Sequence, residues 1–415
     1  MMQKFNPKKT KYVKAANAVL SVFFHEKKAQ TPLDLHHAKN ILVIDAGRIG
    51  DIVMSIPFLK TLKRNAPGAK LTLVCGSWAE AVLKGQGLAD RLLVMDPEAS
   101  GSVAGMIRIY RQLRQINRIC YDIALEPRGD LRYIFFMHWC NARRKVSYRY
   151  TGGECFLTDV VIPPEKAVHL VEDKLYFAKQ TGCRVFRTDR YPKLSLTARQ
   201  IKENEEFIQK HGLLEKQIIG IHPGAGLKIK QWDGFAKLAA KLAADSGHRA
   251  FLIFEGPGEK EAAQKTAQAV RACGGQALVS KTGLAQYLQR LALCHAVICN
   301  DSGAGHIARA YGVTVYVIFG PVEPAFARPY AEDRVFVFSD DSLDCKPCFQ
   351  TSCPRIHEKG SGSGRTCFWK SGRIRGGSQK GRIHAADCEC LKKVTVRQVY
   401  ENIRLREYQI KRISG

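Results

Sequence analysis

The sequence predicts an α/β protein built from two doubly wound parallel-sheet domains that face each other across a cleft. Three observations predict this fold. Short apolar runs of strand length alternate with stretches of helix length along most of the chain. One polar stretch, residues 181–195, interrupts the alternation. Glycine-containing turns follow several apolar runs, and in parallel sheets such turns lie at the carboxyl ends of the strands, where ligands bind.

The order of the elements predicts four segments. Residues 1–39 form a basic arm, residues 40–190 and 191–340 form the two domains, and residues 341–415 form a cysteine-rich basic tail. The first domain has strands at 41–45, 71–76, 91–96 and 121–126, and a helix at 51–64. The second has strands at 218–222, 250–254, 297–300 and 313–319, and helices at 231–244, 259–272 and 303–311. The tail contains a glycine- and arginine-rich stretch, 355–382, that predicts a mobile loop, and a terminal helix at 392–406.

The charge of the chain predicts an anionic partner. Its 415 residues carry 65 Lys and Arg against 38 Asp and Glu, a formal net charge of +27. Residues 1–40 hold eight lysines against two acidic residues, and residues 341–415 hold sixteen basic against seven acidic residues. Nucleic acid, an anionic membrane face and a phosphorylated glycolipid are partners that such a surplus attracts.

Cysteines and apolar runs favour a cytoplasmic protein. The fourteen cysteines are scattered through the expected strands and helices, as buried thiols are in a reducing compartment. No run reaches about 18 apolar residues, so no transmembrane helix is expected. The run at 15–24 lies between lysines and lacks a small-residue cleavage site, so it is not a signal peptide. Residues 11–28 could form a basic amphipathic helix, either a membrane-surface anchor or a helix packed on the main body.

The turn at residues 46–51 (AGRIGD) supplies the first candidate for catalysis. It lies between an expected strand and a helix, and its glycines permit close approach of the backbone. Asp51 falls in the first helical turn, where the helix dipole favours a carboxylate. It is a candidate catalytic acid or base, or an ordinary first-turn acid. The spacing is not G-x-G-x-x-G, so no dinucleotide-binding fingerprint is present.

Two further turns are candidates for phosphate binding. Residues 222–226 (HPGAG) follow a strand, and the backbone around Gly224 could present N–H groups to a phosphate while Lys230 adds a positive charge. Residues 300–306 (NDSGAGH) also lead from strand to helix. There Asp301 or Ser302 could cap the helix, and the open helix start at Gly303 forms an anion site that His306 could reach. A plain turn with exposed lysines and a well-capped helix are the alternatives.

A fourth turn, residues 255–261 (EGPGEKE), carries carboxylates after a strand. Glu259 or Glu261 could accept hydrogen bonds from a ribose, as acids do in other nucleotide-binding sheets, or could simply begin an acidic helix.

With these segments aligned, the chain resembles the ADP-heptose:lipopolysaccharide heptosyltransferases of glycosyltransferase family nine. The matching segments are ILVIDAGRIGDIVMSIPFLKTLK, IIGIHPGAGLKIKQW and VICNDSGAGHIARAYGVTVYVIFGP, together with CKPCFQTSCP and CLKKVTVRQVYENI near the end. They extend from about residue 40 to 405. The arm, the stretch 355–382 and the basic run 228–230 depart from the family pattern.

The resemblance implies a GT-B fold of two Rossmann-like domains and an inverting, metal-independent transfer without a cofactor. It implies ADP-heptose or a similar nucleotide sugar as donor, a lipopolysaccharide-core-like acceptor, and attachment to an anionic membrane surface at the cytoplasmic face. On the family pattern the catalytic base is Asp51, the diphosphate contacts are Lys230, Ser302, Gly303 and His306, the donor-side acid is Asp301, and the ribose acid is Glu259 or Glu261. Nucleic acid is not an expected partner.

Two other functions remain open from the sequence. A sugar-nucleotide epimerase of the same fold would act on the donor without an acceptor. A nucleic-acid-binding protein would use the charge of +27, although no recognition motif is present. Four tail cysteines, Cys345, Cys348, Cys353 and Cys367, could bind a structural zinc ion, but their spacing is not a clean double CxxC, so reduced thiols and no metal are favoured.

Overall fold

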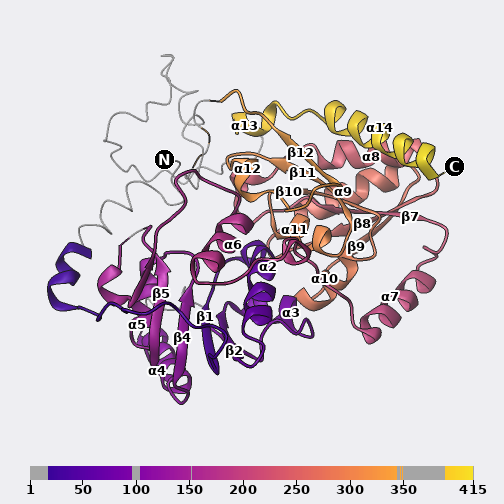
Figure 1. Ribbon diagram of the computed structural model, residues 1–415. Coiled ribbons are helices and arrows are strands. Elements are labelled where there is room, and N and C mark those ends of the chain that lie inside the picture. The colour runs from indigo at the N-terminus through magenta and orange to yellow at the C-terminus, as the bar shows by residue number, and fades with distance from the viewer. Residues whose placement is uncertain are drawn as a thin grey trace, which may run out of the picture. The chain divides into compact units, whose positions relative to one another are not determined.

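The structure is a computed structural model that describes residues 17–95, 103–150, 152–343, 346, 348 and 388–414. The chain divides into two compact units, Met1–Leu194 and Ser195–Gly415. The division falls inside the polar stretch 181–195, where the sequence analysis expected the domain boundary. Each unit contains one six-stranded sheet and is described separately (Figure 1).

Unit 1 is a parallel sheet with the strand order β3-β2-β1-β4-β5-β6. Its strands are β1 (Asn40–Ile44), β2 (Lys70–Cys75), β3 (Arg91–Val94), β4 (Tyr121–Glu126), β5 (Ala142–Tyr148) and β6 (Asp159–Val161). Its helices are α2 (Ile49–Asn65), α3 (Ser77–Leu83), α4 (Val103–Ile116), α5 (Leu131–His138) and α6 (Leu170–Gln180), with short 3-10 turns η2 (Glu154–Phe156) and η3 (Arg187–Asp189).

The core of unit 1 explains why its central strands are apolar on both faces. Leu42 and Ile44 of β1 pack into a cluster with residues of α4 and α5. On the other face Phe58 of α2 meets Phe177 of α6 edge to face, with ring centroids 6.0 Å apart. Because helices cover both faces, a central strand reads as a continuous apolar run rather than an alternating one.

Unit 2 repeats this architecture with the strand order β12-β11-β10-β7-β8-β9, again all parallel. Its strands are β7 (Gln217–His222), β8 (Arg249–Phe254), β9 (Gln276–Ser280), β10 (Ala296–Asn300), β11 (Thr314–Phe319) and β12 (Val335–Ser339). Its helices are α7 (Ala198–Lys210), α8 (Phe235–Asp245), α9 (Lys260–Ala272), α10 (Leu284–Leu291), α11 (Gly303–Ala310), α12 (Pro324–Ala327), α13 (Glu389–Lys392) and α14 (Val396–Ser414), with the 3-10 turn η4 (Lys228–Lys230).

The two sheets have the same topology. Counted from its own first strand, each follows the order 3-2-1-4-5-6, which is that of the Rossmann fold. The expected fold class, two doubly wound parallel sheets, is therefore confirmed. Four strands were not expected from the sequence: β5, which lies between β4 and β6, and the edge strands β6, β9 and β12.

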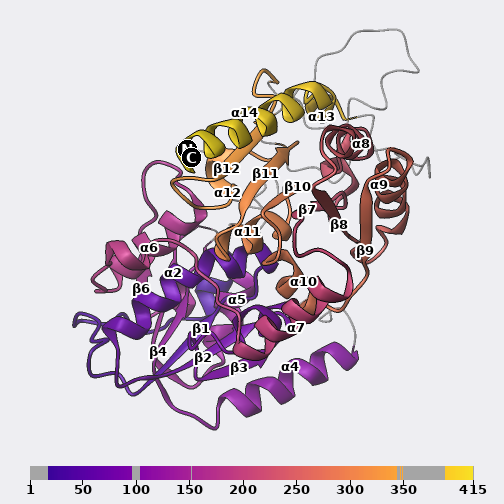
Figure 2. The same cartoon turned by 90° about the vertical axis from the view of Figure 1, so that its right-hand side faces the viewer.

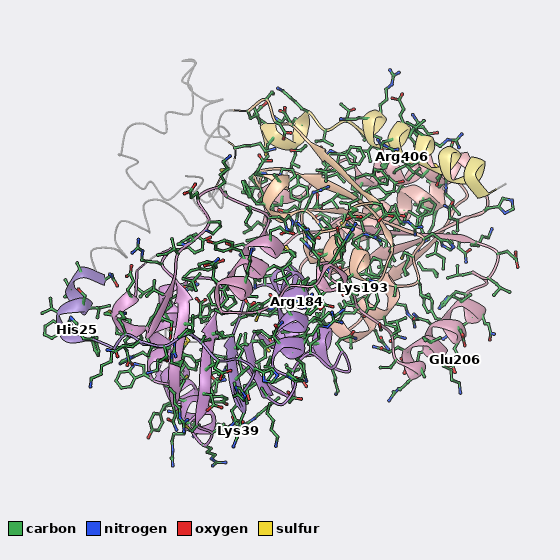
Figure 3. The ribbon with its side chains drawn as sticks, in the orientation of Figure 1. His25, Lys39, Arg184, Lys193, Glu206 and Arg406 are labelled. Atoms are coloured by element: carbon green, nitrogen blue, oxygen red, sulfur yellow. The ribbon has the colours of Figure 1, made fainter. Side chains whose placement is uncertain are left out.

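The end of the chain belongs to unit 2. Helix α14, the yellow helix that ends at the C label in Figures 1 and 2, contacts α8, and its Val399 and Ile403 enter the core cluster of unit 2. The guanidinium of Arg406, labelled in Figure 3, lies 4.9 Å from the centroid of the Phe336 ring. The terminal helix expected at 392–406 begins later, at Val396, because residues 389–392 form a separate turn that buries Cys390 and Leu391. The expected loop 355–382 lies outside the described residues.

The N-terminal segment corrects the expectation of one helix over 11–28. Within the described part of it, only residues 17–23 are helical. The helix ends because the following residues bond to the body of unit 1: the Glu26 amide donates to the Cys155 carbonyl at 2.9 Å and Lys28 Nζ donates to the Leu157 carbonyl at 2.8 Å. His25, labelled in Figure 3, lies just after the end of this helix. In the part of the chain that the structure describes, no helix combines the length and apolar character needed to cross a membrane.

Candidate functional site

The candidate residues gather at the topological switch point of each sheet. In unit 1 the strand order reverses between β1 and β4, and in unit 2 between β7 and β10. In sheets of this type ligands bind outside the carboxyl ends of the strands that flank the reversal. Asp51 follows β1, Lys230 follows β7, and Asp301 to His306 follow β10. Each unit therefore presents its candidate residues at the edge where this fold binds ligands.

Asp51 lies in the first turn of α2 and pairs with Arg128, which follows β4. Its Oδ2 accepts a hydrogen bond from the Arg48 amide at 2.9 Å and lies 3.2 Å from Arg128 Nη1. Each of the two side chains is 25% exposed, so the pair is reachable from solvent. Gly47 makes room for it, since a Cβ on Gly47 would lie 2.0 Å from Arg128 Nη1. The glycine turn that suggested Asp51 thus accommodates a partner that the sequence reasoning missed.

The charge state of Asp51 suits a proton acceptor. Burial by itself would raise the pKa of the Asp51 carboxyl, but the positive charges of Arg128 and Lys174 and the hydrogen bond from Arg48 outweigh burial and hold the pKa below its usual range. A carboxyl with a lowered pKa is ionised at neutral pH, as a general base must be before it takes a proton.

Three buried residues lie behind Asp51. Lys174 Nζ, from α6, donates hydrogen bonds to Asp45 Oδ2 and to the Ser55 hydroxyl. The Ser55 hydroxyl lies 2.6 Å from Asp45 Oδ2 and 2.7 Å from the Asp51 carbonyl oxygen. All three side chains are almost completely buried. Sequence reasoning missed them, and only Asp45, a carboxylate at the end of an apolar strand, carried a local signal.

Glu126 is a second buried acid at the same sheet edge. Its Oε2 accepts hydrogen bonds from the Gly129 amide at 2.6 Å and the Ser147 hydroxyl at 2.7 Å. Burial, only partly offset by these bonds and by Arg128, raises the pKa of Glu126 to about 7. The protonation of this carboxyl therefore changes in the neutral range.

In unit 2 a close ion pair joins Lys230 to Asp301. Lys230 Nζ lies 2.5 Å from Asp301 Oδ2, which links the loop after β7 to the loop after β10. Asn300 ties the same loops together: its Nδ2 donates to the Gly224 carbonyl at 3.0 Å, and its Oδ1 accepts from the Trp232 amide at 2.9 Å. The structure therefore brings Gly224, Lys230 and Asp301 together.

Glu259, and not Glu261, joins this group. Glu259 Oε2 accepts from the Gly256 amide at 3.0 Å and lies 2.9 Å from His222 Nε2, whose Nδ1 lies 2.6 Å from the Tyr287 hydroxyl. Glu261 is exposed in the first turn of α9. Of the two registers that the sequence left open, only Glu259 contacts the loop after β7. His222 and Tyr287 were not among the candidates.

The start of α11 contains Ser302, Gly303 and His306. Ser302 occupies the N-cap position, but its side chain forms no capping hydrogen bond, so the expected side-chain cap is absent. The Ser302 hydroxyl is buried and has no hydrogen-bond partner among the described nitrogen and oxygen atoms. His306 is buried one turn further on. The helix start therefore holds a buried hydroxyl beside the Cys299 thiol that has no nitrogen or oxygen partner among the described residues.

The cysteines considered for zinc fall largely outside the described residues. Cys345, Cys353 and Cys367 lie outside the described residues. Cys348 is described: it is half-buried, and its amide donates to the Pro321 carbonyl at 2.8 Å. Among the residues whose positions are given, no three His, Cys, Asp or Glu side chains are grouped closely enough to hold a metal ion.

Comparisons with known proteins point to one family. The family model described as glycosyltransferase family 9 (heptosyltransferase) matches residues 106–357. A lipooligosaccharide heptosyltransferase 2 of Campylobacter jejuni serotype O:6 is 31% identical over 165 residues, 39% of this chain and 50% of that protein. The protein of the same name from serotype O:2 is 25% identical over 316 residues, 75% of this chain and 90% of that protein.

A solved structure shares the fold. The Escherichia coli ADP-heptose lipopolysaccharide heptosyltransferase II superposes with a TM-score of 0.60 at 21% identity, and the match covers 74% of this chain and 95% of that chain. This chain therefore spans about half the length of the serotype O:6 protein that it matches. It spans most of the length of the serotype O:2 protein and of the Escherichia coli structure.

Proposed function

The chain belongs to glycosyltransferase family 9, and from this membership we propose that it transfers a heptosyl group from ADP-heptose to a hydroxyl of a lipopolysaccharide-core acceptor, with inversion at the anomeric carbon. One observation carries the proposal. An ionised carboxylate, Asp51, lies at the switch point of the first sheet, and a lysine–aspartate pair, Lys230–Asp301, lies at that of the second. These are the groups that such a transfer requires.

Asp51 acts as the general base. The acceptor hydroxyl loses its proton to the Asp51 carboxylate while its oxygen forms a bond to the anomeric carbon, and the bond to the ADP oxygen breaks. Attack from the face opposite the leaving group inverts the configuration. Arg128 keeps the carboxylate ionised and oriented, and general-base catalysis contributes about 10²–10⁴ in rate.

Unit 2 binds the donor. Negative charge develops on the diphosphate as the glycosidic bond breaks, and Lys230 stabilises it together with the backbone N–H groups at Gly303 and the Ser302 hydroxyl. When the donor binds, Lys230 exchanges its contact with Asp301 for one with the diphosphate, and Asp301 contacts the donor sugar. His306 of α11 binds the diphosphate as well. Glu259 accepts the ribose hydroxyls, with Gly224 leaving the space that its carboxylate occupies.

The charge on the leaving group is met by protein groups, so we propose that the transfer proceeds without a metal ion or cofactor. A lysine ammonium and a helix start supply the positive potential that a divalent cation supplies in other transferases.

We further propose that the protein works at the cytoplasmic face of an anionic membrane, where a lipid-anchored acceptor is presented. An exposed apolar patch on unit 1 supports this: Val19, Val22 and Phe23 of the N-terminal helix, and Phe135 and Trp139 of the α5 segment. The two groups are joined through Phe24, whose ring lies 5.6 Å from that of His138. Lys27 and Lys28 follow the helix, and residues 1–16 contain five lysines. Apolar side chains beside a basic cluster bind anionic bilayers.

The test is a transfer assay with purified protein, ADP-heptose and a heptose-deficient lipopolysaccharide core. We expect ADP release and an acceptor heavier by one heptosyl residue. ADP-heptose incubated without acceptor is the control, since conversion of the donor alone would indicate an epimerase. Absence of product across a panel of nucleotide sugars and core acceptors would contradict the proposal.

A further inference from the structure

Two carboxylates and two cations are grouped around the first turn of α2: Asp45, Asp51, Arg128 and Lys174. We propose that Lys174 is a positioning residue for the transfer, because by neutralising Asp45 it keeps Arg128 on Asp51. The inference rests on the proposed role of Asp51 as the base. It gives a function to a buried ion pair that does not itself reach the acceptor.

The Lys174–Asp45 pair is sealed from solvent. The side chain of Lys174 is 5% exposed and that of Asp45 is 1% exposed. Lys174 Nζ also donates to the Ser55 hydroxyl at 2.5 Å, and that hydroxyl lies 2.7 Å from the Asp51 carbonyl oxygen. The pair is thereby connected to the backbone of the proposed base. Removing one partner of such a pair leaves an uncompensated charge in the interior, which must find another partner.

Arg128 has two carboxylates within reach. Its Nη1 lies 3.2 Å from Asp51 Oδ2 and 3.8 Å from Asp45 Oδ1. Asp45 Oδ1 is buried and has no hydrogen-bond partner among the described residues. A shift of the guanidinium by a fraction of an ångström would exchange one partner for the other.

Lys174 determines which partner Arg128 takes. With Lys174 on Asp45 Oδ2, the charge of Asp45 is balanced and Arg128 is attracted chiefly to Asp51. Without Lys174, Asp45 would be an unpaired charge in a dry interior, where Coulomb attraction is strongest, and would draw Arg128 away from Asp51. Asp51 would then lose its partner and its fixed orientation.

Other charged or titratable groups face the same guanidinium. Glu126 at the end of β4 and Tyr133 of α5 act on Arg128, and the Asp51 carboxylate also feels Lys174 directly. Burial lowers the pKa of Lys174, and Asp45 opposes that shift. Glu126 and Tyr133 are unchanged in the variants below, so the comparison isolates the Lys174–Asp45 pair.

The test compares Lys174→Met with the double variant Lys174→Met/Asp45→Asn. Loss of Lys174 alone should lower kcat on the order of a hundredfold, the effect of misplacing a reacting group by about 1 Å. It should also move the acidic limb of the kcat pH profile to higher pH, because the Asp51 carboxyl loses the cations that lower its pKa. The double variant carries no unpaired acid, so Arg128 should return to Asp51 and the acidic limb should move back toward that of the wild-type protein. ADP binding by calorimetry should be unchanged in both.

Lys63→Met is the matched control. Lys63 lies on α2, and its ion-pair partner among the described residues is Asp90 near the surface, at 3.0 Å, so its removal deletes a lysine without touching the buried pair. Its pH profile should match that of the wild-type protein.

A crystal structure of Lys174→Met supplies a readout that does not depend on turnover. Arg128 Nη1 should lie within hydrogen-bond distance of Asp45 Oδ1. Arg128 remaining on Asp51, or an unmoved acidic limb, would overturn the inference. If the wild-type protein transfers no sugar, the proposed function fails, whereas the position of Arg128 still decides the pairing. If Lys174→Met does not fold, the crystal structure of the double variant decides: Arg128 away from Asp51 would overturn the inference, and Arg128 paired with Asp51 would support it.

Discussion

The carboxylate of Glu259 lies directly against Gly224: a Cβ on Gly224 would be 1.9 Å from Glu259 Cδ and 2.0 Å from its Oε2. The loop after β7 and the loop after β8 therefore fit together only because residue 224 has no side chain. In this arrangement Glu259 also contacts His222, so the glycine, the acid and the imidazole form one unit.

Gly224→Ala should displace Glu259 and weaken ADP binding. A new methyl group cannot occupy the space of a carboxylate, and a displaced hydrogen-bonding acid costs about 1–3 kcal/mol, or about 5- to 150-fold in affinity. Calorimetric titration with ADP measures the change. Gly226→Ala is the matched control, since a Cβ there has nothing within 4 Å. Equal affinities in the two variants would contradict the prediction.

Asp51→Asn should retain ADP binding and lower kcat by about 10²–10⁴-fold, because an amide cannot take the acceptor proton. In the wild-type protein, activity should persist to acidic pH, because the lowered pKa keeps Asp51 ionised, and should fall as the pH drops through that pKa. Asp34→Asn, an exposed carboxylate paired with His37, serves as the control. Undiminished turnover in Asp51→Asn would remove Asp51 as the base.

Glu259→Gln and Glu261→Gln distinguish the two candidate ribose acids. Loss of a charge-assisted hydrogen bond costs about 1.5–3 kcal/mol, so Glu259→Gln should weaken ADP binding by about tenfold or more. Glu261→Gln should leave it unchanged, because that side chain is exposed on α9. Competition with ribose 5-phosphate and ADP measures the contribution of the sugar. The opposite order of affinities would reassign the role to Glu261.

Glu126→Gln should change how stability depends on pH. Because burial raises the pKa of Glu126 to about 7, the folded protein holds a proton that the unfolded chain releases. Stability of the wild-type protein should therefore fall as pH rises from about 4.5 through 7, by up to about 3 kcal/mol. The uncharged glutamine should remove this loss. Urea unfolding at pH 5 and pH 8 tests it, with exposed Glu80→Gln as the control; equal slopes in all three proteins would refute it.

Phe23→Ser should weaken binding to vesicles of anionic lipid. Phe23 is 76% exposed in the apolar patch, and burying an aromatic side chain in the bilayer interface contributes about 1.5–3 kcal/mol. Sedimentation with phosphatidylglycerol vesicles should show loss of binding by about tenfold or more, and zwitterionic vesicles should bind less in every case. Leu214→Ser, at a side chain 75% exposed on unit 2, is the control. If both variants bind like the wild-type protein, the patch is not the docking face.

The strands that the sequence analysis identified are those with continuous apolar runs. β1 and β10 are buried on both faces, and their composition alone marks them. β5 was missed because it begins Ala142-Arg143-Arg144-Lys145. Two of these cations pair with acids from other segments of the chain. Arg144 pairs with Asp159 of β6, and Lys145 Nζ lies 2.7 Å from Glu26 Oε1 in the N-terminal segment. No local pattern reveals such partners.

The residues of the candidate site are also of two kinds: some are indicated by the local sequence, and others are brought together only by the fold. Asp51, Lys230 and Asp301 stand beside glycines or small residues at strand ends, so local sequence indicates them. Lys174 lies in the middle of α6, in a helix with no unusual composition, and only the fold brings it to Asp45. The choice between Glu259 and Glu261 likewise depended on which side chain turns toward Gly224.

The C-terminal helices have a practical consequence for engineering. The Trp232 indole, two residues after Lys230, donates to the Val394 carbonyl at 2.8 Å, and Arg249 at the start of β8 bonds to Glu407 at 2.5 Å. Unit 2 therefore runs from residue 195 to the end of the chain, and the C-terminal helices are part of its fold. A chimera that exchanges unit 2 with a relative must take the sheet and the C-terminal helices from the same parent, and a purification tag belongs at the other end of the chain.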